Sequence, residues 1–119
     1  MYLSFVEKLV AQGCLHAAVC DIEGNLLGKA SSQKGDFCIT NREIFDIKEG
    51  FNNPKYIETF GFYIGMEHYK TMNFDKSTIY GKNSSNNWVC ITKTSTTIII
   101  ALGLSPSKIN DCIKSLHTV

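Results

Sequence analysis

Short apolar runs separated by turn-forming residues fill the second half of the chain, and this pattern constrains the fold more than any other feature. Five strand candidates follow one another, at residues 60–64, 68–74, 77–81, 88–94 and 96–102. Their separators carry Gly, Asp, Lys, Ser and Asn, which are typical of tight turns. Strands joined by such short connections pair antiparallel, because a parallel crossover needs roughly a dozen residues or more. The sequence therefore predicts an antiparallel meander.

The first quarter of the chain predicts a helix followed by a hairpin. Residues 2–12 place apolar side chains on one face at helical spacing, and Gly13 is a suitable stop. Residues 16–22 form a short β-branched stretch, 23–25 read as a tight turn, and a second strand begins at Leu26.

Two further helices are predicted from their end signals. Thr40 and Glu43 have the spacing of a capping box, which predicts a helix ending near Gly50. The sequence Asn-Asn-Pro at 52–54 is expected to interrupt regular secondary structure there. Ser-Pro at 105–106 combines an N-cap with proline at the first helical position, ahead of an apolar stripe. The element order therefore predicts an α+β domain with helices packed on an antiparallel sheet.

Composition fits one domain over residues 1–119 and excludes several classes of protein. The chain is 44% hydrophobic, which is enough for a core. A net charge of +1 argues against a nucleic-acid-binding surface. Five cysteines without a CxxC motif favour a reducing compartment. We read no signal peptide and no membrane-spanning run, so we expect a cytoplasmic protein.

No motif for catalysis or metal binding stands out. The histidines, at 16, 68 and 117, form neither HExxH nor a zinc-type pair with cysteine. There is no GxSxG, GxGxxG or Walker loop, and the carboxylates are scattered. We therefore expect no enzyme, no cofactor and no metal. The residues alone predict a soluble α+β binding domain.

Segments in collinear order over about a hundred residues resemble the profilin family. They lie at residues 4–13, 16–30, 42–54, 60–83 (with the phrase TIYGK at 78–82), 88–103 and 108–116. The resemblance implies an antiparallel β-sheet flanked by N- and C-terminal helices on one face and a central helix on the other. It also implies a monomeric, cytoskeleton-associated protein.

The resemblance further implies binding of monomeric actin by the late strands and the start of the last helix. The matching positions are Lys70, Thr71, Asn73, Lys82, Trp88, Lys108, Asn110 and Asp111. The lysines would attract an acidic partner, and Trp88 would anchor it if exposed. The family usually has Arg at Asn73 and often a basic residue at Asp111, which predicts weaker or differently selective binding. A core position for Trp88 and purely solvated lysines remain alternatives.

Proline-rich segments are a second implied partner. Tyr2 and Phe5 match two aromatic residues of the family's first helix, and with Leu116 and Val119 they could form a shallow groove. Gly28 falls where a second Trp is usual, and we expect the last aromatic-bearing turn to be missing, so we predict weak binding. Tyr2 and Phe5 could instead simply pack the helix onto the sheet.

Phosphoinositide binding by surface lysines is the third implied activity. Two other classes of protein stay open. One is a non-enzymatic scaffold or interaction module of related shape, acting in trafficking or GTPase regulation as a dimer. The other is a small-molecule sensor with a pocket inside the sheet.

Overall fold

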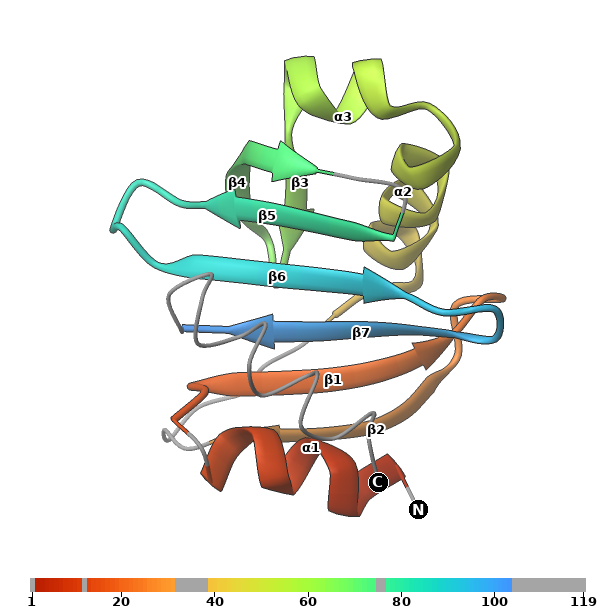
Figure 1. Cartoon of the computed structure of the whole chain (residues 1–119), viewed down its shortest axis with the longest axis vertical. Coiled ribbons are helices and arrows are strands. Elements are labelled where there is room, and N and C mark those ends of the chain that lie inside the picture. The colour runs from red at the N-terminus through yellow and green to blue at the C-terminus, as the bar shows by residue number, and fades with distance from the viewer. Residues whose placement is uncertain (1, 12, 32–38, 75–76, 104–119) are drawn as a thin grey trace.

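Seven strands in the described part of the chain form one antiparallel sheet (Figure 1). The computed structural model describes residues 2–11, 13–31, 39–74 and 77–103. The strands are β1 (His16–Asp21), β2 (Leu26–Ser31), β3 (Phe62–Ile64), β4 (Glu67–Phe74), β5 (Thr78–Lys82), β6 (Trp88–Lys93) and β7 (Thr97–Leu102). Their spatial order is β2-β1-β7-β6-β5-β4-β3. The predicted hairpin and meander are both confirmed, and β7 joins them by pairing with β1.

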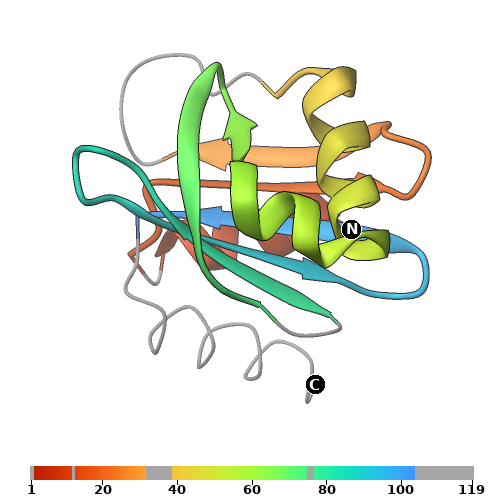
Figure 2. The same cartoon turned by 90° about the horizontal axis from the view of Figure 1, so that it is seen from above.

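Three helices cover the two faces of this sheet. They are α1 (Tyr2–Ala11), α2 (Asn41–Asn52) and α3 (Pro54–Phe60). Figure 2 shows α2 and α3 on one side of the sheet and α1 on the other. The predicted C-terminal helix from residue 105 lies outside the described residues. No helix that the structure describes is long and apolar enough to cross a membrane.

Each face of the sheet buries its own core. Ile98 and Ile100 of β7 point to the α2/α3 side, whereas Ile99 between them points to the α1 side. Successive strand residues alternate between faces, so a central strand covered on both sides reads as one apolar run. This explains why residues 97–102 are buried throughout.

The structure corrects the sequence prediction around Pro54. Instead of interrupting regular structure, Pro54 begins α3. Proline is tolerated in the first turn of a helix because the backbone N–H that it lacks would have no hydrogen-bond partner within the helix. Ile57 is buried against the sheet and gives the short helix its packing. Phe60 is therefore the last helical residue and not the start of a strand, and Gly61 ends the helix with φ 71°.

The predicted capping box of α2 is confirmed, and its Glu43 side chain forms further hydrogen bonds outside the helix. The Thr40 hydroxyl accepts the Glu43 amide at 3.1 Å, and the Glu43 carboxylate accepts the Thr40 amide at 3.0 Å. The same buried carboxylate accepts the amides of Gly65 and Met66 at 3.1 and 2.8 Å. Glu43 thus joins the start of α2 to the β3–β4 turn and so helps to position β4.

Candidate functional site

Two lysines and the tryptophan lie in one row across three strands. Lys70 of β4 is directly opposite Lys82 of β5, which is directly opposite Trp88 of β6. Directly opposite residues share a face, with Cβ atoms about 5 Å apart. The Lys82 Nζ lies 5.5 Å from the centroid of the Trp88 ring, within cation–π range. We call these three residues the basic row.

The positive charges of the basic row are not neutralised within the described chain. The ion pair found among the described residues joins Arg42 and Asp46 on α2, and none there involves Lys70 or Lys82. Like charges directly opposite each other on a sheet destabilise it. The pair is therefore suited to a partner that brings negative charge.

The loop between β5 and β6 holds Lys82 and Trp88 side by side. Buried Asn83 accepts the amides of Ser85 and Asn87 on its side-chain oxygen, at 3.0 and 2.9 Å. The carbonyl of Trp88 accepts the amide of Gly103 at 2.7 Å. Trp88 is half-buried, is the first residue of β6, and does not belong to the fully buried core that was the alternative for it.

A pocket of about 710 Å³ adjoins the basic row. Its walls come from the end of α3, from β4 and from the β5–β6 connection: Thr59, Phe60, Gly61, Glu67, His68, Lys70, Met72, Lys82, Asn83 and Ser84. Phe60 and Met72 expose about half or more of their surface there, at 60% and 47%. Apolar side chains next to charged groups are the usual composition of a protein-binding surface.

Sequence reasoning missed both of these apolar side chains. The sequence pattern predicts a strand at Phe60, and nothing in it indicates that this side chain lies at the end of a helix. Met72 did carry a signal, because it is two residues from Lys70 on the same strand and alternation puts both on one face.

Thr71 is not brought to the basic row. It lies opposite Gly81 on the α2/α3 side, where it is buried and its hydroxyl donates to the Ile57 carbonyl at 2.6 Å. The reason is the same alternation, which turns the neighbour of Lys70 to the other face. Asn73 is exposed and pairs with Tyr80, one position further along β5.

The remaining predicted site residues cannot be placed relative to the basic row. Lys108, Asn110, Asp111, Leu116 and Val119 lie outside the described residues. Tyr2 and Phe5 belong to α1, whose side chains are described from Val6 onward.

The groups with displaced pKa values do not belong to the basic row itself. Burial raises the pKa of Tyr69 to about 12, with the nearby Glu67 charge adding to it. Burial likewise lowers the pKa of His16. Within the described ranges, no cluster of three or more His, Cys, Asp and Glu side chains could hold a metal ion.

The comparisons with known proteins agree with one another. A family model described as Profilin matches residues 2–119. Profilin of Saccharomyces cerevisiae is 28% identical over 98 residues, which cover 82% of this chain and 75% of the yeast protein.

Solved structures show the same fold. Profilin IB of Acanthamoeba castellanii has a TM-score of 0.84 at 26% identity, over 98% of this chain and 93% of that chain. Mouse profilin IIa, in complex with a double repeat from the FH1 domain of mDia1, has a TM-score of 0.69 at 19% identity, over 97% and 95% of the two chains. Since the family model spans nearly the whole sequence and the α+β architecture matches, this chain belongs to the profilin family of actin-binding regulators.

Proposed function

We propose that this protein binds monomeric actin through the basic row and the adjoining pocket, and so regulates polymerisation without a catalytic step. The observation that carries the proposal is the juxtaposition of Lys70 and Lys82, which form no ion pair with any described residue, with the half-buried ring of Trp88. Cations without internal partners attract an acidic surface and orient it. A large aromatic side chain beside them can supply the main anchoring contact.

The other predicted actin-binding residues have different roles in this proposal. Asn73 is exposed on the same strand as Lys70, opposite Tyr80, and its neutral amide favours weaker or differently selective binding than an arginine would. Lys108, Asn110 and Asp111 would extend the surface from the last helix. Thr71 supports the surface from beneath, because its hydrogen bond to Ile57 fixes β4 to α3.

Weak binding of proline-rich segments is the second part of the proposal. The mouse relative is in complex with an FH1 repeat. Here Tyr2, Phe5, Leu116 and Val119 would form the groove. Gly28 of β2 pairs with Val19 of β1 and offers no ring for a proline to stack on. Titration with an oligoproline peptide should give weak binding, and tight binding would contradict this part.

Phosphoinositide binding would draw on the same lysines. A head group bound at Lys70 and Lys82 would compete with actin, because both partners need these cations. Vesicles containing a phosphoinositide should therefore release actin, whereas neutral vesicles should not.

The deciding experiment is actin polymerisation with and without the purified protein, at matched salt and with actin from the same source. We expect concentration-dependent slowing with one-to-one stoichiometry. Lys82→Glu should weaken actin binding about tenfold or more, because attraction becomes repulsion. Lys93→Glu is the matched control, since Lys93 lies on the neighbouring strand β6, at the end far from Trp88 and the basic row. Absence of any effect of the unmodified protein would overturn the proposal and favour the scaffold alternative.

A further inference from the structure

Sulfur atoms in the described chain fall into two classes of accessibility. The thiols of Cys14, Cys20 and Cys90 are 0% exposed, and burial raises the pKa of Cys20 to about 11, which disfavours its reactive thiolate. The thioethers of Met66 and Met72 belong to residues that are 86% and 47% exposed. An oxidant in solution therefore reaches these methionines before it reaches those thiols.

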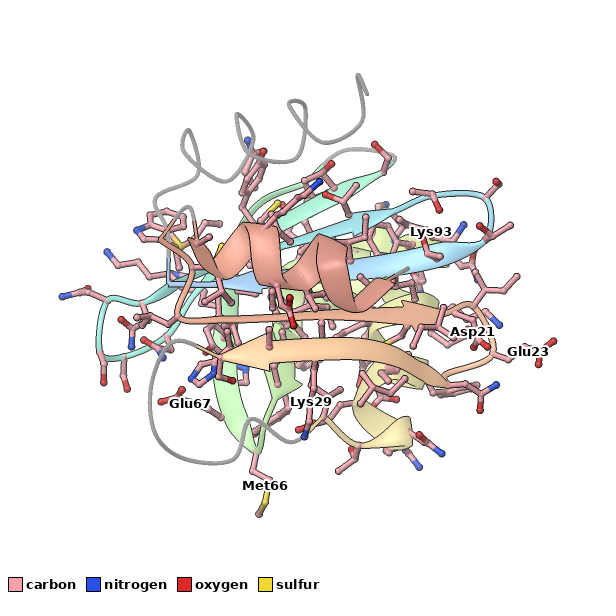
Figure 3. All side chains as sticks on the ribbon, turned by 90° about the horizontal axis from the view of Figure 1, so that it is seen from below. Asp21, Glu23, Lys29, Met66, Glu67 and Lys93 are labelled. Atoms are coloured by element: carbon pink, nitrogen blue, oxygen red, sulfur yellow. The ribbon has the colours of Figure 1, made fainter. Side chains whose placement is uncertain are left out.

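The two methionines differ in where they lie. Met66 is at the tip of the β3–β4 turn and points away from the sheet (Figure 3). Met72 lines the pocket together with Phe60, Lys70 and Lys82.

Met72 also occupies an irregular point of the sheet. Pairing between β4 and β5 passes from Thr71–Gly81 to Asn73–Tyr80, so Met72 is an extra residue without a partner across the strands. Bulges of this kind re-aim a side chain and recur beside functional sites. Met72, at this bulge, brings a thioether to the candidate binding surface, where no thiol of the described residues is exposed.

We propose that Met72 is an oxidation site at which conversion to the sulfoxide by a peroxide weakens actin binding; this inference rests on the proposed function. The thioether sulfur attacks one peroxide oxygen, the O–O bond breaks, and that oxygen stays on sulfur as S=O. The other oxygen leaves as water, or as an alcohol from an organic peroxide, after proton transfer. Sulfur loses two electrons and the peroxide gains them, so the reaction balances.

Two physical effects make the sulfoxide unfavourable at this position. The apolar thioether becomes a polar group that loses its hydration when a partner covers it. The new oxygen is also a hydrogen-bond acceptor beside Lys70 and Lys82, and it competes there with acidic groups of the partner. Together we expect a loss of affinity of about tenfold or more.

The test oxidises this protein alone with hydrogen peroxide, removes the peroxide, and then measures affinity for monomeric actin. Met72→Leu keeps an apolar side chain of similar volume without oxidisable sulfur, and Met66→Leu is the matched control. Peptide masses report oxidation at each methionine, thiol titration reports the cysteines, and circular dichroism reports the fold. Methionine sulfoxide reductase supplies the reversal.

Each outcome has a definite meaning. The inference is supported if the wild type and Met66→Leu lose affinity on oxidation, Met72→Leu retains it, and the reductase restores it. It is overturned if wild type with oxidised Met72 binds as before, if Met72→Leu loses affinity equally, or if Met72 resists oxidation while Met66 reacts. If the untreated protein fails to bind actin, the proposed function itself is overturned, and the predicted effect on binding goes with it.

Discussion

At the residue scale, the properties of Trp88 come from its neighbours on both sides. Lys82 lies over its ring, and the amide of Gly103 holds its carbonyl. The ring is partly buried and already held in place, so a partner that covers it loses little side-chain conformational entropy on binding.

Replacing Trp88 with alanine should therefore weaken actin binding by about 2 kcal/mol, roughly thirtyfold. Affinity for monomeric actin measured by titration checks this. Phe45→Ala is the matched control, because Phe45 is 54% exposed on α2, outside the pocket walls. Equal losses in the two variants would show that Trp88 has no special part in binding.

At the element scale, α2 and the β3–β4 turn are linked by one side chain. The Glu43 carboxylate accepts hydrogen bonds from the amides of Thr40, Gly65 and Met66. Because the side chain is buried, the carboxylate has little contact with water. Gly65 and Met66 both have positive φ, at 60° and 68°, which is the backbone of a tight two-residue turn. Met66 adopts this conformation without being glycine, so the hydrogen bonds from Glu43 help to hold it there.

Glu43→Ala should lower the free energy of unfolding by about 2 kcal/mol, since it removes a helix cap together with the hydrogen bonds from the Gly65 and Met66 amides. Urea unfolding measures this. The exposed Glu49 of the same helix provides the control, and Glu49→Ala should change the free energy by less than about 0.5 kcal/mol. A loss no larger for Glu43 than for Glu49 would mean that the bridge to the turn contributes nothing.

The β1–β2 turn makes stability depend on pH. The Asp21 carboxylate accepts the amides of Asn25 and Glu23 at 2.8 and 3.0 Å, and the Asn25 side chain at 3.0 Å. These hydrogen bonds, led by that from the Asn25 amide, lower the pKa of Asp21. The resulting stability is present above the ordinary Asp pKa of about 4 and is lost as pH falls through the lower folded value.

Asp21→Asn should therefore be less stable than the wild type at pH 7, and the difference should shrink as the pH falls below about 4. Thermal unfolding midpoints of the two proteins, recorded from pH 7 to pH 3, test this. A difference that stays constant over the whole range would show that the charge of Asp21 is not involved.

At the scale of the whole molecule, the two cores share the same strands. Ala18 and Cys20 of β1 belong to the α2/α3 core, and Ala17 and Val19 of the same strand belong to the α1 core. If the strands unfold, both cores are lost together, because each core is built on the same strands. We therefore propose that residues 1–119 form one domain that unfolds in a single transition.

Trp88 is the only tryptophan of the chain, so its fluorescence reports the start of β6, whereas far-UV circular dichroism reports all helices and strands. The two signals should give coincident unfolding curves in urea. Separate midpoints would indicate that part of the chain unfolds independently.

Much of the fold could be predicted because it depends on neighbours in sequence. Strand alternation, turn residues and the Thr40–Glu43 capping box are local signals, and the structure confirms the elements that they predict. The short helix α3 was missed because Pro54 permits either a break or a helix start. Packing of Ile57 against the sheet, which involves residues distant in sequence, favours the helix.

The sequence by itself determined the order of the helices and strands other than α3 and, through resemblance, the family and the basic positions. Only the tertiary structure decided which of those positions share a face. Lys70, Lys82 and Trp88 form a row because strand register aligns them, while Thr71 points into the core and Met72 lies at a bulge. Register is set by pairing between separate strands and by burial on both faces, and neither is encoded by nearest neighbours in the chain.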